Sequence, residues 1–192
     1  MEKKQQLYET AKQIFSEKGF KETNIAAITK AAHMAVGTFY LYYTSKEQIF
    51  MEIYRNENTA LKHACLAKLD MTQPPLAVIR QMLQLNQEGI AGNPILREWY
   101  RSDAFRQIEA SFREENAGES LGFLYDTFLE LIERWQTEGV MRSDIPAQKI
   151  MLMFAALVNV DTHKDEIGLE HFPELLDMMT ELLVNSLTNC TR

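Results

Sequence analysis

The chain has 192 residues, of which 46% are hydrophobic and 24% are charged, a composition typical of a soluble globular protein. No apolar run approaches the ~18 residues that a membrane span needs, and no apolar signal region follows the charged first residues. A membrane protein is therefore excluded, and we expect the chain to remain in the cytoplasm.

The net charge is −7, which by itself argues against nucleic acid as a partner. Its distribution changes that interpretation. Residues 1–50 contain seven lysines and five glutamates, a net charge of +2, whereas the rest of the chain has a net charge of −9. Because attraction to phosphate is local, a basic segment can bind DNA on an acidic protein.

Helical periodicity runs through nearly the whole chain, and no strand alternation is evident. Three helices are expected in the first 45 residues, at about 4–18, 24–31 and 36–42. Gly19 ends the first as a C-terminal cap, and Thr23 can cap the second. Ser45 begins a long fourth helix, with Gln48 three residues later completing a capping box.

The rest of the chain is predicted to be helical as well, with prolines at helix starts and glycines at helix ends. Six further helices are expected, at about 46–70, 75–89 or 75–92, 95–113, 119–138, 146–162 and 173–188. The fold class is therefore all-α with about nine helices. A three-helix head (residues 1–46) is expected to form a helix-turn-helix domain, and residues 47–192 a larger helical body.

The stretch from Thr23 to Phe50 carries the functional signal. Two short helices joined by a tight turn are typical of a helix-turn-helix, whose second helix enters the DNA major groove. Gly37 would let the backbone approach phosphates because it has no side chain. Tyr40 and Tyr42 can donate hydroxyl hydrogen bonds to phosphate oxygens, and Lys46 adds a positive charge.

Gly37-Thr38-Phe39-Tyr40-x-Tyr42 followed by Ser45-Lys46-Glu47 resembles the signature of the tetracycline-repressor (TetR) family of transcriptional regulators. Several residue types recur there at fixed offsets, and the motif covers about a quarter of the chain. The resemblance implies that Phe39 packs inward and that eight residues bind DNA. These are Thr23, Tyr40, Tyr42 and Lys46 at phosphates, Gly37 where the backbone approaches phosphates, Thr38 facing the groove, and Ala35 and Val36 at base-reading positions.

Two residues depart from the family pattern. His33 stands where a turn glycine is usual, and histidine is among the non-glycine residues that tolerate positive φ. Val36 occupies a position often filled by lysine or another polar residue. An apolar pair, Ala35 and Val36, would read thymine methyl groups rather than form hydrogen bonds to bases.

The resemblance also implies a small-molecule effector in the helical body, apolar or amphipathic in character. The candidate ligand-binding residues are Tyr54, Met82, Asn86, Trp99, Tyr100, Phe105, Tyr125 and Phe128. The alternative for each is plain core packing, since aromatic residues at helical spacing are normally core. Glu98 lies in the same region and is expected at the surface, with pairing to a cationic ligand as the alternative.

The last two expected helices have broad apolar faces, wider than one core needs. Such faces suggest a homodimer in which two helices from each subunit form a four-helix interface. The candidate interface residues are Phe154, Leu157, Leu175, Met179, Leu182 and Leu183. Two-fold symmetry would match a palindromic operator on double-stranded DNA.

No metal, cofactor or catalytic site is expected. His163, Asp165, Glu166 and His171 match no standard metal spacing, and no nucleophile–base set or phosphate-binding loop is present. Cys65 and Cys190 have no CxxC spacing and are expected to be reduced, with a redox switch as the alternative.

The sequence thus predicts a ligand-responsive repressor that a small molecule releases from DNA. The alternatives are a ligand-binding or adaptor dimer whose head has lost DNA specificity, and an enzyme.

Overall fold

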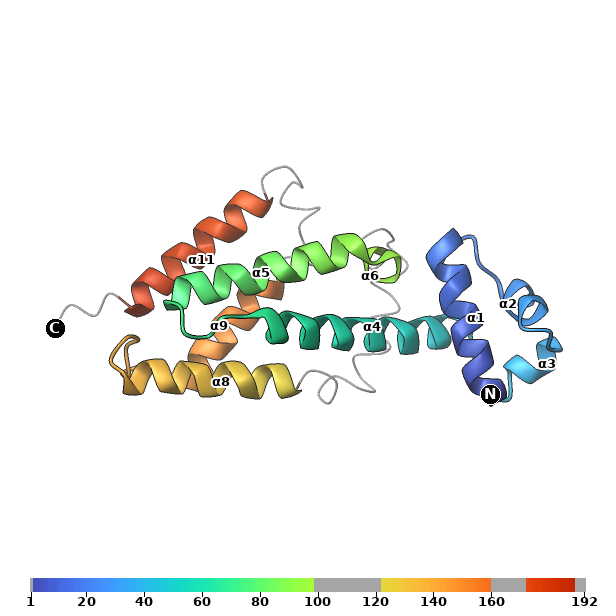
Figure 1. Cartoon of the computed structure of the whole chain (residues 1–192), viewed down its shortest axis with the longest axis horizontal. Coiled ribbons are helices and arrows are strands. Elements are labelled where there is room, and N and C mark those ends of the chain that lie inside the picture. The colour runs from blue at the N-terminus through green and yellow to red at the C-terminus, as the bar shows by residue number, and fades with distance from the viewer. Residues whose placement is uncertain (1, 99–121, 160–171, 189–192) are drawn as a thin grey trace. The chain divides into compact units, whose positions relative to one another are not determined.

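The computed structural model describes residues 2–98, 122–159 and 172–188, which form nine helices and no strand (Figure 1). The predicted all-α fold class is confirmed for this part of the chain. The helices are α1 (Lys3–Lys18), α2 (Ile25–Ala31), α3 (Val36–Phe39), α4 (Lys46–Lys68), α5 (Pro75–Gly92), α6 (Pro94–Glu98), α8 (Gly122–Thr137), α9 (Ala147–Asn159) and α11 (Phe172–Thr188).

The chain divides into two compact units. The first contains the described residues of 1–64 and 86–120, and the second those of 65–85 and 121–192. Helices α4 and α5 each contribute one part to each unit. The predicted boundary between head and body, at residues 46 and 47, is a different division and stays a prediction.

The core of the first unit is built around three phenylalanines. The ring centroids of Phe15 and Phe50 lie 5.1 Å apart and those of Phe20 and Phe50 lie 5.0 Å apart, both in edge-to-face geometry. Residues of α1, α2, α3 and α4 complete this core, and Ile95 of α6 joins it. Helix α6 therefore packs with the N-terminal helices although it lies more distant in the sequence.

Helix α1 ends at Gly19, as predicted. The Gly19 N–H donates to the carbonyl of Phe15, and Gly19 has φ 81° and ψ 171°. This region of backbone conformation is essentially restricted to glycine. The reversal after α1 therefore depends on the absence of a Cβ at this position.

The predicted cap of the second helix is wrong by one residue. Asn24, not Thr23, is the N-cap of α2, and its side-chain oxygen accepts from the Ala27 N–H at 2.8 Å. The Thr23 hydroxyl donates instead to the carbonyl of Gly19 at 2.7 Å. Both residue types can cap a helix, but the Thr23 hydroxyl is occupied by the turn that precedes α2.

The predicted capping box at the start of α4 forms with a small displacement. The Gln48 N–H donates to the Ser45 hydroxyl at 3.2 Å. The Gln48 side-chain oxygen accepts from the Thr44 N–H at 2.6 Å, one residue earlier than the usual partner. Helix α3 is shorter than predicted, because it ends at Phe39 with Tyr40 as its C-cap.

The second unit has its own core, formed by residues of α5, α8, α9 and α11. Ile132, Trp135, Ile150 and Val184 are among its fully or nearly fully buried members. Arg80 of α5 makes a bidentate pair with Asp177 of α11, at 2.6 and 2.8 Å. Of the two expected stops, Gly89 and Gly92, helix α5 ends at Gly92. Residues 99–113, expected to continue the sixth helix, lie outside the described residues.

Substituting Gly19 by alanine tests the turn after α1. We expect the Gly19→Ala variant to lose about 1–3 kcal/mol of unfolding free energy, because alanine is strained in this conformation. Urea denaturation measures the loss. The control is Gly92→Ala, since a Cβ at Gly92 would meet nothing within 4 Å. Equal stability of the two variants would contradict this assignment.

Candidate nucleic-acid interface

The segment from Val36 to Tyr43 alternates between buried anchors and exposed apolar side chains. Phe39 is 0% exposed and Tyr43 2% exposed, and both belong to the core of the first unit. The residues around them face outward: Val36 is 46%, Tyr40 56%, Leu41 78% and Tyr42 37% exposed. Apolar side chains gathered on the surface of a small domain are typical of a binding face.

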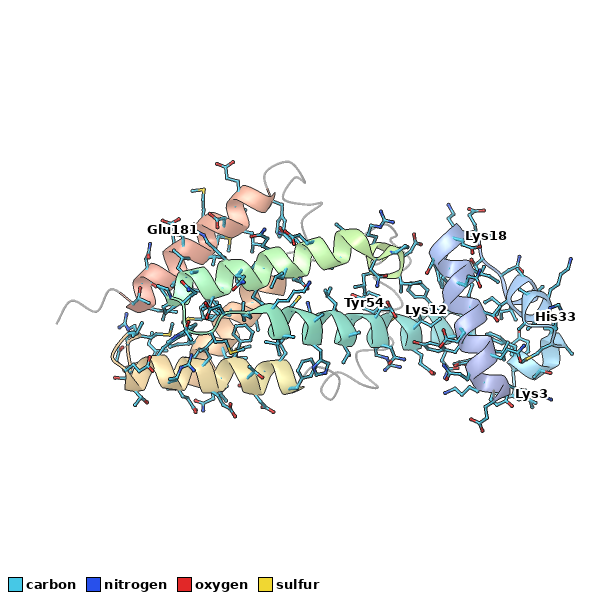
Figure 2. All side chains as sticks on the ribbon, in the orientation of Figure 1. Lys3, Lys12, Lys18, His33, Tyr54 and Glu181 are labelled. Carbon is cyan, nitrogen blue, oxygen red and sulfur yellow. The ribbon has the colours of Figure 1, made fainter. Side chains whose placement is uncertain are left out.

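The turn between α2 and α3 depends on a histidine. His33 has φ 55°, the only positive φ at a non-glycine among the described residues, and it lies between the two helices (Figure 2). The next N–H, of Met34, donates to the carbonyl of Thr29 at 2.8 Å. The prediction that His33 adopts a turn-glycine conformation is confirmed.

The start of α3 presents the residues predicted to read bases. Ala35 is the N-cap and provides no side-chain hydrogen bond. Ala35, Val36 and Gly37 are exposed, and Thr38 is partly exposed. The structure therefore brings these four predicted residues together with Tyr40 and Tyr42 on one short stretch of surface.

Lys46 is engaged within the protein. Its ammonium group donates to the carbonyls of Phe20, at 2.9 Å, and of Thr23, at 2.8 Å. The same nitrogen lies 4.1 Å from the centroid of the Phe20 ring, a cation–π contact. Lys46 thus joins the start of α4 to the turn between α1 and α2. Thr23 is 2% exposed, so it too lies beneath the surface.

The predicted ligand-binding residues fall into both units and partly outside the described residues. Tyr54 packs against the core of the first unit, and Asn86 accepts a hydrogen bond from Lys62. Phe128 belongs to the core of the second unit, and the partly buried Met82 packs against it. Tyr125 is partly exposed. Trp99, Tyr100 and Phe105 lie outside the described residues. Their role in binding a ligand stays a prediction.

The predicted dimer-interface residues differ in exposure. Phe154 is 7% exposed and Leu157 5% exposed, so both side chains lie in the chain's own cores. Leu182 is 68% exposed, and Leu175, Met179 and Leu183 are partly exposed. Two exposed residues that sequence reasoning missed, Leu152 and Met178, lie on the same helices, beside the exposed Met153 of the predicted apolar face. Their helical spacing relative to the buried residues was the available signal.

No set of three or more His, Cys, Asp or Glu residues in the described part of the chain could hold a metal ion. His163, Asp165, Glu166 and His171 lie outside that part. Among the residues with described structure, no helix is both long and apolar enough to cross a membrane.

Comparisons with known proteins agree with this geometry. The family of bacterial regulatory proteins called tetR matches residues 7–53. The uncharacterized HTH-type transcriptional regulator YfiR of Bacillus subtilis is 24% identical over 157 residues, 81% of this chain and 75% of that protein. The probable acrEF/envCD operon repressor of Escherichia coli is 24% identical over 156 residues, 78% of this chain and 70% of that protein.

Solved structures share the fold over nearly the whole chain. FadR of Thermus thermophilus, a TetR family transcriptional repressor in complex with lauroyl-CoA, has a TM-score of 0.65 at 23% identity and covers 98% of this chain and 96% of its own. The fatty acid degradation regulator FadR of Bacillus halodurans has a TM-score of 0.63 at 17% identity, covering 96% and 95%.

The turn at His33 and the buried side chains of Phe39 and Tyr43 hold an exposed face on α3, the second of two short helices arranged as in a helix-turn-helix. With the matching family and relatives, this makes the chain a transcriptional regulator and not an enzyme. Residues 7–53 match the tetR family of bacterial regulatory proteins, and the relatives that span most of the chain are named as transcriptional regulators or repressors.

Replacing His33 by glycine tests the strained turn. Glycine adopts the positive φ of position 33 without strain, which stabilises the folded state. The greater freedom of glycine in the unfolded chain offsets part of this gain, so we expect the unfolding free energy to rise by about 0.5–1 kcal/mol. The control is His63→Gly within α4, which should lower it by a similar amount because glycine disfavours helix interiors. Thermal denaturation of the two variants should therefore shift in opposite directions. A shift in the same direction would contradict the assignment of strain to His33.

Proposed function

We propose that the chain is a repressor that binds a palindromic operator as a homodimer and is released by a small molecule. The observation that supports this most is the exposed surface of Val36, Tyr40, Leu41 and Tyr42 on the family's DNA-reading segment. The Escherichia coli relative is named as a probable operon repressor, which favours repression over activation. Bacterial DNA lies in the cytoplasm, so the protein would act there.

Ala35 and Val36 would read bases by apolar contact. Neither side chain can form a hydrogen bond, and Val36 is nearly half exposed in the protein alone. The feature in the major groove that suits such side chains is the thymine C5-methyl group. Thr38 would reach the groove edge, and the hydroxyls of Tyr40 and Tyr42 would bind phosphates.

Gly37 would allow the backbone to approach the DNA. A Cβ built at Gly37 meets nothing within 4 Å in the protein. The protein's own packing therefore does not require glycine at this position, although glycine weakens the short helix that contains it. Close contact with an external surface such as a phosphate backbone accounts for it.

Thr23 and Lys46 would support DNA binding indirectly, by holding the backbone near α2 in place. Their polar groups are bound to backbone carbonyls of the first unit. We therefore propose that they hold the turn before α2 in place, and that the exposed tyrosines make the phosphate contacts.

The dimer would form through the exposed apolar side chains of α9 and α11. Leu152 and Met153 on α9 and Met178 and Leu182 on α11 are 40–68% exposed. Burying such residues against a second copy is favourable by about 25 cal/mol for each Å² of apolar surface removed from water. Two-fold symmetry would then place two reading helices about one DNA turn apart.

The effector would be amphipathic, with a long apolar part. The Thermus thermophilus repressor of the same fold was solved with lauroyl-CoA, which makes fatty acyl-CoA the first class to test. A ligand can release DNA only if it binds the conformation that fits DNA and the conformation that does not with different affinities. The candidate contacts remain those predicted from the sequence, including Tyr54, Met82 and Tyr125.

The function is tested by selecting duplexes from random DNA with the full chain. Fluorescence anisotropy then measures affinity for the selected duplex, for a scrambled duplex, and during titration with lauroyl-CoA. We expect a palindromic consensus, weak binding to the scrambled duplex, and release by the ligand. No consensus would favour the adaptor alternative, and a consensus without release would reject acyl-CoA as the effector.

Gly37→Ala should separate DNA binding from stability. We expect affinity for the selected duplex to fall about tenfold, the cost of losing a charge-assisted contact to phosphate. The unfolding free energy should stay equal or rise by up to about 1 kcal/mol, because alanine favours helix. Gly92→Ala serves as the control. Unchanged DNA affinity in Gly37→Ala would rule out close backbone approach there.

Replacing contacted thymines by deoxyuridine removes only their methyl groups. If Val36 reads such a methyl group, the replacement should weaken binding by about 0.8 kcal/mol per site, the value of one buried carbon group. A double-mutant cycle compares this loss of affinity in the wild type and in Val36→Ala. We expect the loss to be smaller in Val36→Ala. The same loss in wild type and Val36→Ala would show that Val36 does not read the methyl group.

Leu182→Glu should convert the dimer to a monomer, because it places a charge in a proposed apolar interface. Sedimentation velocity measures the oligomeric state at several concentrations. The control is Leu41→Glu, which places the same charge on another highly exposed leucine, outside that interface. A Leu182→Glu variant that sediments as a dimer would contradict the proposed interface.

A further inference from the structure

Helix α6 is bound to the N-terminal helices at both of its ends. It has only five residues, Pro94–Glu98, too few for a helix to be stable alone. Its Ile95 side chain is 1% exposed and belongs to the same core as Phe15, Phe39 and Phe50. The apolar contact places α6 against this core, and polar groups at each end determine its alignment.

The first end is held through Asn93 and Glu57. The Asn93 side-chain oxygen caps α6 by accepting from the N–H groups of Ile95, at 2.9 Å, and Leu96, at 3.3 Å. Its amide donates to Glu57 Oε2 of α4 at 2.7 Å. The other oxygen of Glu57 lies 2.5 Å from the ammonium nitrogen of Lys12 on α1. Glu57 thus connects α1, α4 and the cap of α6.

This connection is partly shielded from solvent, and Lys12 points from α1 toward α4 (Figure 2). The hydrogen bond with Glu57 raises the pKa of Lys12, although burial acts in the opposite direction. The ammonium form of Lys12 is therefore stabilised where it lies. Asn93 and Lys12 occupy different oxygens of one carboxylate, so both bonds can form together.

The second end is held through Glu98. Its Oε2 accepts from the Phe20 N–H at 2.8 Å. The same carboxylate lies against Gly19, where a Cβ would be 3.2 Å from Oε1. Glu98 therefore binds the turn between α1 and α2, which is the turn whose carbonyls hold Lys46. A carboxylate binds the N–H of Phe20, and an ammonium binds its carbonyl.

This turn determines where α2 begins, and α2 packs against α3. From these contacts we propose that α6 is a clip on the DNA-binding head and that Glu98 is a positioning residue for DNA binding. Without the bond from Glu98, the turn loses a charge-assisted contact to the Phe20 N–H, and the face of α3 loses its alignment to DNA. The proposal rests on DNA binding and is independent of the effector.

If Glu98 acted only through its charge, removing it would have the opposite effect on DNA affinity. Removing a carboxylate near a DNA-binding surface reduces repulsion of the phosphates, so it should strengthen binding. Loss of alignment should weaken it. The sign of the change therefore separates a positioning residue from an acidic residue that merely lies nearby.

The experiment compares full-length Glu98→Ala, Glu98→Gln and Glu17→Ala on the duplex selected by the wild type, at fixed salt and 25 °C. Glu17 is an exposed acid on α1 whose partner is the nearby Gln13, so its variant controls for charge. We expect Glu98→Ala to bind about tenfold more weakly, since a charge-assisted hydrogen bond is lost. Glu98→Gln keeps an acceptor oxygen and should bind within about threefold of the wild type. Circular dichroism verifies that each variant is folded.

Two results on DNA would overturn the proposal: equal affinity of Glu98→Ala and Glu17→Ala, or equal loss in Glu98→Ala and Glu98→Gln. Amide hydrogen exchange of the free protein gives a second readout that needs no DNA. Glu98→Ala should speed exchange in residues 20–39 relative to Glu17→Ala, and unchanged exchange there would also overturn the proposal. Failure of the wild type to bind any duplex would instead count against the proposed function.

Discussion

The burial of Phe39 and Tyr43 is the constraint on which the exposed face proposed to read DNA depends. Helix α3 has four residues and cannot persist without tertiary contacts. The two aromatic side chains, four residues apart, lie in the core of the first unit and turn the intervening residues outward. Tyr40, Leu41 and Tyr42 are therefore exposed because the two side chains that flank them are buried. The exposure of these side chains is a consequence of the buried anchors, and it provides the surface that we propose for recognition.

Polar contacts around the turn between α1 and α2 add a second level of order. Lys46 binds its carbonyls, Thr23 binds the carbonyl of Gly19, and Glu98 binds the N–H of Phe20. Each charged group satisfies backbone atoms that a tight reversal leaves without helical partners. Helix α6, which is distant in the sequence, thus packs within the first unit and helps to hold α2 and α3 in position. Helices α4 and α5 continue from this unit into the second unit, where α5, α8, α9 and α11 share a separate core.

Sequence reasoning predicted the features that depend on local pattern. Helical periodicity predicted the helices, and the fixed offsets around Gly37 and Tyr42 predicted the family match of the N-terminal segment. The tolerance of histidine for positive φ predicted the turn at His33. Sequence reasoning missed the partners of Lys46 and Glu98, because these partners are backbone carbonyl and N–H groups, which every residue type provides. It also could not decide which side of a broad apolar helix faces inward, so Phe154 was placed at an interface and Leu152 was not.

We propose that the face of α3 and the residues after it dock on DNA. Amide hydrogen exchange of the full chain, with and without the selected duplex, measures this most directly. We expect strong additional protection across residues 35–44 on DNA binding and little change in α8. Protection concentrated elsewhere, with residues 35–44 exchanging as in the free protein, would contradict it.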